Sequence, residues 1–347
     1  MSDNLMSLVS VNTIQHSVDR RITRFVLGVT VAAALAYGIN WGLSFVMPVF
    51  LAKFLVDKPV LTRQIFDELV LAMVATVLIG LSISNGVTHY PLVLLLLVGL
   101  LMFGAYYLFM DPEWNLFATI LIISALLIPY MGIINPAAAL FLGKGLMISG
   151  VGAVIMFVLM HCLFPDKAPQ SVKAKLKPVL PSSSQRTKEA LRALMISFPV
   201  IAFFYYFQIN GALLTLAFIG ILSLQITGQK SVKLSAFLLL TNSIGGILAV
   251  IAYELLVTVP WFPFLVALLV LFTCTFANKI YSNPLKAPIW SGALTALLVV
   301  LGTALSSESK EIDVGFYTRI TQIFLAGIYM IFISFLLESR NKSKHDS

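Results

Sequence analysis

Long apolar runs separated by short polar connections dominate the chain. Apolar runs of about 18 residues or more predict transmembrane helices, because about 20 residues of α-helix are needed to cross a bilayer. The pattern predicts twelve helices. The first, second, seventh and eighth are short, so each of those pairs is either two tilted helices or one hairpin. The runs cover residues 25–37, 43–52, 69–84, 91–110, 116–131, 137–164, 193–207, 213–224, 234–257, 262–277, 288–305 and 315–337.

Composition agrees with this pattern. The 347 residues are 59% hydrophobic and 11% charged, with a mean hydropathy of +0.96. A soluble domain of this length would carry far more charge. The predicted fold class is therefore an all-α polytopic membrane protein.

Basic residues give the orientation. Of the 23 Lys and Arg residues, 20 lie in the two terminal segments or near connections that follow an even-numbered helix. By the positive-inside rule, both termini and the basic linker 165–189 are expected in the cytoplasm of a bacterial cell, with the helices in its inner membrane. The prolines and serines of the linker indicate a flexible loop. The net charge of +8 thus reflects topology, and nothing in the sequence suggests a nucleic-acid partner.

The two halves of the chain look like copies of each other. Phe141 and Lys144 match Phe316 and Arg319 at a constant offset of 175 residues. Six helices are an even number, so both copies keep the same orientation and a twofold axis along the membrane normal relates them. The predicted order is a cytoplasmic segment 1–20, a first repeat 21–164, the linker 165–189, a second repeat 190–338 and a tail 339–347.

Lys144 and Arg319 are the basic side chains that lie well inside apolar runs. A cation at the centre of a membrane helix costs about 2.5 to 3.5 kcal/mol on insertion scales, so two at matching positions suggest a shared task. Two interpretations remain open. The side chains either reach back to the headgroups, or they face the axis between the halves as a paired anion site. Gln322 adds a polar side chain one turn after Arg319.

Three further polar residues are candidates. Asn40 and Asn210 follow the first and seventh helices; each either caps freed backbone groups or hydrogen-bonds a substrate. Glu254, near the end of the ninth helix, either exchanges a coupling proton or reaches the interface. His161 is expected to be an interfacial residue rather than a proton relay. Trp41 is assigned to the aromatic belt at the membrane surface.

Several catalytic patterns are missing. The chain has no Walker A sequence, no HExxH and no GxSxG, and its cysteines have no partners at metal-ligand spacing. We therefore expect no enzyme, cofactor or metal. A membrane-embedded enzyme and a non-transporting scaffold subunit of an envelope complex are the alternatives to a transporter.

Taken together, these features resemble the fusaric acid resistance family and its aromatic carboxylic acid exporters. The resemblance spans residues 20–338. It rests on the duplicated six-helix unit, on Arg24 and Arg192 just before the first helix of each half, and on the pattern Phe-x-x-Lys/Arg-x-x-x-Ile-x-x-x-Gly in each closing helix. It is closest to the compact branch, in which a short linker replaces the large soluble domain.

The resemblance implies an inner-membrane exporter of aromatic or hydrophobic weak acids that works with a periplasmic adaptor of the membrane-fusion type. It is also compatible with a homo-oligomer. A carboxylate needs a cation and an aromatic ring needs an apolar wall. Lys144 and Arg319, with Phe141 and Phe316, would supply both.

Overall fold

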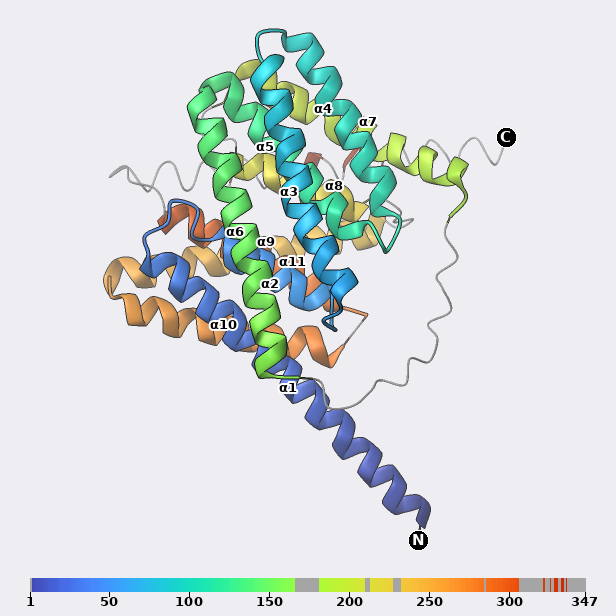
Figure 1. The fold of residues 1–347 in the computed structure, drawn as a ribbon, viewed down its shortest axis with the longest axis vertical. Coiled ribbons are helices and arrows are strands. Elements are labelled where there is room, and N and C mark those ends of the chain that lie inside the picture. The colour runs from blue at the N-terminus through green and yellow to red at the C-terminus, as the bar shows by residue number, and fades with distance from the viewer. Residues whose placement is uncertain are drawn as a thin grey trace.

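The chain folds into α-helices joined by short connections (Figure 1). This computed structural model describes residues 2–165, 181–209, 213–226, 232–283 and 285–305, with scattered positions between 321 and 335. Side chains are described from residue 18 onward, except at 214, 218 and 225–242. Within these ranges every element is helical, and eight helices are long and apolar enough to cross a membrane. The predicted all-α polytopic membrane fold is confirmed.

Eleven helices lie where apolar runs predicted them, and the run at 315–337 falls almost wholly outside the described residues. Helices in the first half are α1 (Ser2–Gly38), α2 (Val46–Asp57), α3 (Arg63–Gly86), α4 (Pro91–Phe109), α5 (Asn115–Ile134) and α6 (Pro136–Leu163). The second half has α7 (Ser183–Phe207), α8 (Leu213–Ile226), α9 (Val232–Thr258), α10 (Phe262–Ser282) and α11 (Ala287–Leu305).

Two helices begin earlier than the apolar runs that predicted them. Helix α1 begins at Ser2, inside the expected polar segment 1–20, and α7 begins at Ser183, inside the expected linker 165–189. The side chain of Ser182 accepts a hydrogen bond from the Gln185 backbone N–H at 3.3 Å. A serine in this place caps the first turn and allows the helix to start in a polar sequence.

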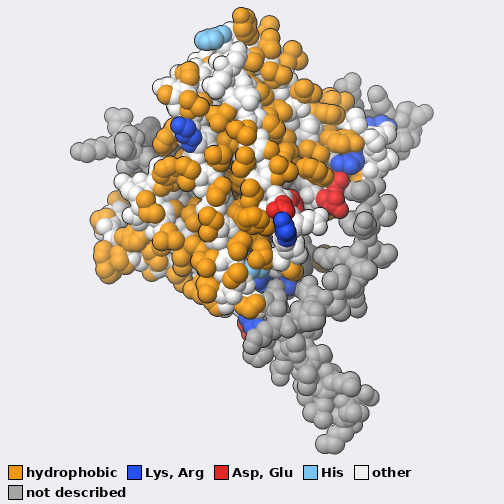
Figure 2. Space-filling model, in the orientation of Figure 1, with side chains coloured by type: hydrophobic (Ala, Val, Ile, Leu, Met, Phe, Trp, Pro, Cys, Tyr) orange, Lys and Arg blue, Asp and Glu red, His pale blue; other side chains and the backbone are white. Residues whose placement is uncertain are grey.

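The outer surface of the helices is apolar. On α4, for example, Leu96 and Leu100 are 72% and 65% exposed, whereas Val98 and Met102 are fully buried. Hydrophobic side chains cover the face in Figure 2, with most of the charged ones toward its lower right. Apolar side chains that face outward over whole helices are stable in lipid and not in water.

Helix packing repeats between the halves. Helix α3 packs closely against α5, and α9 packs in the same way against α11. Contacts between the halves also come in matching pairs: α1 with α10 and α4 with α7, then α2 with α11 and α5 with α8. Each helix has an equivalent in the other half, whose number is six higher or six lower. Replacing both helices of one contact by their equivalents gives the other contact of the same set. Such an exchange is what a twofold axis between two copies requires.

Individual residues follow the same symmetry. The Thr30 and Thr273 hydroxyls are 3.3 Å apart between α1 and α10, and the Tyr106 and Ser197 hydroxyls are 2.7 Å apart between α4 and α7. Thr30 to Ser197 and Tyr106 to Thr273 are both offsets of 167 residues. Two equivalent hydroxyl contacts at one offset support the duplication independently of helix hydropathy.

The first helix of each half packs on the other half. Helix α1 packs on α10 of the second half, and α7 packs more extensively against α4 than against α8 in its own half. In Figure 1, α3 and α6 cross in front of α9 and α11. The halves are therefore interlocked rather than two separate bundles.

Candidate functional site

The break between α1 and α2 is built from residues that tolerate a left-handed backbone. Asn40 has a φ of 55°, a conformation that asparagine adopts more readily than most residues. Its N–H donates to the Tyr37 carbonyl at 3.0 Å, and the Ser44 N–H donates to the Trp41 carbonyl at 2.9 Å. The chain thus leaves one helix and enters the next within a few residues, and the Asn40 side chain is exposed.

Helix α6 packs against this break. The rings of Trp41 and Phe141 lie 6.4 Å apart between centroids, and the Trp41 indole N–H donates to the buried Ser149 hydroxyl at 3.2 Å. A Cβ added at Gly42 would lie 3.0 Å from the Phe141 ring. The hydrogen bond and the glycine together fix Trp41 on α6. This packing role was not predicted from the aromatic belt.

Lys144 lies one turn after Phe141, on the same face of α6. It is exposed, as are Phe141 (54%), Ile148 (55%) and Ile155 (63%), which form one outward stripe. The other face of α6 packs on α1, α2, α3 and α5, all of the first half. Lys144 therefore lies one turn from Phe141 on the outward side of α6 and does not point between these helices.

Lys144 follows the first residue of α6, Pro136, by eight positions, which corresponds to about 12 Å along the helix. Its outward position does not place it toward the other half, as a paired anion site on the axis between the halves would require. A lysine on the outer side of a membrane helix is also the arrangement in which the side chain extends toward the headgroups. The paired site therefore stays a prediction.

Other predicted site residues are placed differently. Phe316, Arg319, Gln322 and Asn210 lie outside the described residues. Glu254 is exposed on α9, one turn before its end, where its carbonyl accepts from Thr258 at 3.0 Å. The structure thus brings Asn40, Phe141 and Lys144 to one region.

Asn40 has a conformational equivalent in the second half. Gln208, just after α7, has a φ of 47°, and these two are the described non-glycine residues with positive φ. From Asn40 to Gln208 the offset is 168 residues, the same as from Arg24 to Arg192. The break after α1 is therefore matched by the break after α7, two residues before the predicted Asn210.

Sequence reasoning missed a set of tyrosine contacts between the halves. Tyr205 of α7 donates to the Leu126 carbonyl of α5 at 2.7 Å, and Tyr130 of α5 donates to the Ile209 carbonyl after α7 at 2.6 Å. The proline within α5, Pro129, has no N–H for the carbonyl of Ala125, which lies 3.4 Å from the Tyr205 hydroxyl. A proline inside an apolar helix was the available signal, since a freed carbonyl needs a donor.

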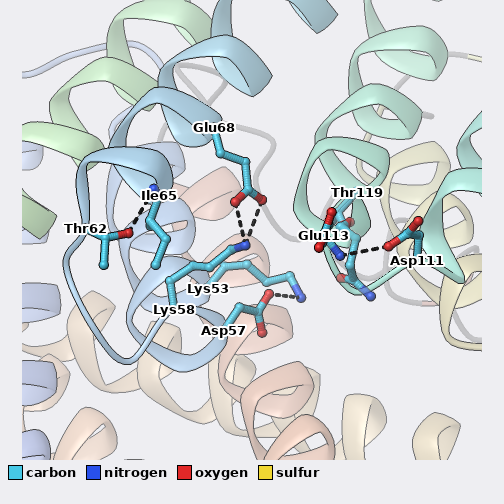
Figure 3. Close-up of polar contacts among 10 residues, drawn as sticks. Lys53, Asp57, Lys58, Thr62, Ile65, Glu68, Asp111, Glu113 and Thr119 are labelled. Atoms are coloured by element: carbon cyan, nitrogen blue, oxygen red, sulfur yellow. Dashed lines mark hydrogen bonds and ion pairs between the residues drawn. The ribbon is translucent and has the colours of Figure 1, made fainter. Parts of the chain in front are cut away.

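Charged side chains gather at one end of the helices, which we call the charged end. Lys58 bonds both carboxylate oxygens of Glu68 at 2.7 Å, and Lys53 pairs with Asp57 at 2.7 Å (Figure 3). Asp111 accepts from the Glu113 N–H at 3.1 Å in the α4–α5 turn of the same view. Ion pairs therefore lie at one end of the helices, and the break that contains Trp41 lies at the other. Polar and aromatic residues at the two ends of apolar helices are typical of a bundle that crosses a membrane.

Arg24 closes the charged end. It is 2% exposed and donates to the carbonyls of Pro59 at 3.1 Å and Phe164 at 3.4 Å. One guanidinium therefore joins α1 to the α2–α3 connection and to the end of α6. A buried arginine with carbonyl partners holds backbone segments together.

Comparison with known proteins places the first half in context. No curated protein and no solved structure matches the chain. Among the residues that the structure describes, no cluster of three His, Cys, Asp or Glu side chains could hold a metal ion. The resemblance to fusaric acid resistance exporters stays a prediction. Residues 21–160, which run from the start of the first repeat almost to the end of α6, match the family described as Protein of unknown function (DUF2955).

Proposed function

We propose that the protein is a membrane transporter that exports small organic anions, with aromatic or hydrophobic weak acids as its substrate class. One observation supports this most directly: Lys144 lies within an apolar helix, one turn from Phe141, whose ring contacts Trp41. A cation and two aromatic rings in an apolar setting are complementary to an aromatic carboxylate.

Each group has a distinct role in this proposal. The Lys144 ammonium pairs with the carboxylate, and the Phe141 and Trp41 rings contact the apolar part of the acid. The indole N–H of Trp41 is bonded to Ser149, so the ring is held in place rather than free to turn. Because Lys144 and Phe141 are exposed on the outer stripe of α6, an acid dissolved in the membrane can reach them.

In this proposal the second half carries an equivalent set of candidate residues. Arg319, Phe316 and Gln322 stand at the matching positions of the closing helix, and Asn40 and Asn210 at the two breaks. Arginine binds a carboxylate through two parallel hydrogen bonds and lysine does not, so the halves contribute unequally. Glu254 is the candidate for proton coupling.

Orientation and partners extend the proposal. The charged end faces the cytoplasm of a bacterial cell, with both termini on that side of the inner membrane. A periplasmic adaptor of the membrane-fusion type carries the acid onward. This part rests on the resemblance to acid exporters and on the charge distribution of the connections.

A toxicity panel tests the function. Cells with and without the gene, and with and without an adaptor, are grown in the presence of toxic concentrations of aromatic acids, aliphatic acids, cations or neutral compounds. We expect protection against aromatic acids, and no protection against the cations. Protection limited to cations or neutral compounds would contradict anion export, and no protection at all would favour a scaffold subunit.

The site is tested with matched charge removals. Lys144→Gln and Arg319→Gln should each lower acid export, while Lys286→Gln, which removes an exposed lysine between α10 and α11, should not. Lys144→Gln and Arg319→Gln should insert normally, because losing a cation from an apolar segment makes insertion easier. Lys286→Gln should also insert, because its position lies between two helices. A Lys144→Gln, Arg319→Gln double variant that exports at the parent rate would refute the site.

A further inference from the structure

His161 has carbonyl groups at both ring nitrogens. It lies in the last turn of α6 and is 7% exposed. Its Nδ1 is 2.9 Å from the Phe157 carbonyl oxygen, and its Nε2 is 3.4 Å from the Pro59 carbonyl oxygen in the α2–α3 connection. The imidazole thus bridges the end of α6 and a separate segment of backbone.

This arrangement distinguishes the two protonation states of the ring. A neutral imidazole carries one N–H and can donate to only one carbonyl, whereas an imidazolium donates to both. With Nδ1–H bonded to Phe157, a second proton on Nε2 adds the bond to Pro59. Binding one proton therefore adds a direct bond between α6 and the α2–α3 connection, beside the bonds that Arg24 makes to Pro59 and Phe164, and losing the proton removes that direct bond.

Some neighbours of His161 favour its charged form, and others disfavour it. The C-terminal end of a helix favours a cation, and the Phe157 ring lies 4.2 Å from the imidazole between centroids. Against the cation stand burial and Arg24, which donates to the same Pro59 oxygen at 3.1 Å. Groups that favour the charged imidazole and groups that disfavour it therefore both lie against this ring.

Two lysines at this end are paired with carboxylates, whereas Arg24 is buried with carbonyl partners. Lys58 pairs with Glu68 and Lys53 with Asp57, and helix α5 contains no charged residue. The charged residues at this end of the helices packed against α6 are Asp19, Arg20, Arg21 and Arg24 of α1, Lys53 and Asp57 of α2, Lys58 after it, and Arg63, Asp67 and Glu68 of α3.

We propose that His161 is a proton-binding site that controls the α2–α3 connection, residues 58–62. The proton comes from water at the charged end, binds Nε2 and forms the N–H bond to the Pro59 carbonyl; the same proton returns to water when the bond breaks. This assigns a proton-coupling role to a residue that sequence reasoning placed at the interface without one.

A proton at this position can influence the anion site. Helix α2 begins beside the break that contacts Phe141 and ends at the connection held by His161. It packs on α1, on α6 and, across the halves, on α11. Movement of its end therefore reaches both the break and the interface between the halves. This coupling to export rests on the proposed function, whereas proton binding itself does not.

A fluorescent reporter tests proton binding without any substrate. Val60 is 42% exposed in the connection, so Val60→Cys can be labelled in a chain that also carries Cys162→Ser and Cys274→Ser. The protein is placed in lipid nanodiscs and titrated from about pH 5 to 8, where imidazole changes charge. We expect a pH-dependent emission change that is lost in His161→Gln and retained in His89→Gln. An unchanged response in His161→Gln would overturn the proposal.

A second measurement covers the case in which His161→Gln fails to fold. The triple variant His16→Gln, His89→Gln, His345→Gln keeps His161 as its sole histidine. Nuclear magnetic resonance of its 15N-labelled imidazole should show conversion from the neutral to the cationic ring over the same pH range. A ring that keeps one charge state throughout would refute proton binding. In export assays, His161→Gln should flatten the pH profile for 4-hydroxybenzoate. A pH-sensitive ring in a protein that exports no acid would separate this inference from the proposed function.

Discussion

Replacing Gly245 by alanine tests how closely two repeated helices approach. Gly245 lies on α9, where a Cβ would overlap the Ala293 carbonyl oxygen of α11 and lie 3.1 Å from the Ala296 Cβ. The obstacle is backbone, which cannot turn aside as a side chain does. Its neighbour Gly246 has nothing within 4 Å of the equivalent position, and so provides a matched control on the same helix.

The expected magnitude follows from two opposing contributions. Alanine favours a helix over glycine by about 1 kcal/mol, and Gly246→Ala should show this gain or no change. Overpacking a tight contact costs roughly 1 to 3 kcal/mol, and backbone overlap places Gly245→Ala at the upper end. The two neighbouring variants should therefore differ by about 2 to 3 kcal/mol in the free energy of unfolding, with Gly245→Ala the less stable.

The assay is equilibrium unfolding of the purified protein in mixed detergent micelles, followed by loss of helical circular dichroism. Gly80→Ala tests the first half, where a Cβ would lie 3.0 Å from the Ser124 carbonyl oxygen and 2.9 Å from the Ile128 side chain. Its loss should be smaller, because Ile128 can adjust. Equal stability of Gly245→Ala and Gly246→Ala would refute the close packing of α9 and α11.

Three further outcomes are expected. Tyr205→Phe removes the donor to the Leu126 carbonyl and should lower stability by about 1 to 3 kcal/mol, whereas Tyr206→Phe, at a position 76% exposed, should leave the unfolding midpoint unchanged. Thr62→Ala removes the cap that accepts from the Ile65 N–H and should cost about 1 kcal/mol, against no loss for Thr258→Ala in the same thermal unfolding assay. In a chain free of native cysteines, Val60→Cys should react with a membrane-impermeant maleimide only after cells are opened; labelling of intact cells would reverse the proposed orientation.

Helix positions were predictable because hydropathy alone decides which segments enter a membrane. Each of the eleven described helices overlaps a predicted apolar run. The start of α7 was not predicted, because Ser182 and the polar residues after it were assigned to the linker. In the structure Ser182 caps the helix, and a cap is recognised only together with the turn that it begins.

The surroundings of Lys144 were harder to predict. The sequence neighbour of Lys144, Gly145, is small and buried, but adjacent helical residues point about 100° apart. Gly145 faces Leu43 and Ser149 faces Trp41, while Lys144 lies on the outward side. Contacts across the halves, such as Tyr106 with Ser197, depend on helix register, which hydropathy does not specify.

The interlocked halves have a consequence for how the protein is made. Thr30 of α1 meets Thr273 of α10 at a sequence separation of 243 residues. At roughly 5 to 20 residues per second of synthesis, α1 spends about 12 to 50 s in the membrane before its partner exists. Tyr106 waits for Ser197 over 91 residues, which takes about 5 to 18 s at the same rates. Until then the hydroxyl groups of the first half face lipid or an assisting protein, so the ribosome finishes most of the chain before the central contacts can form.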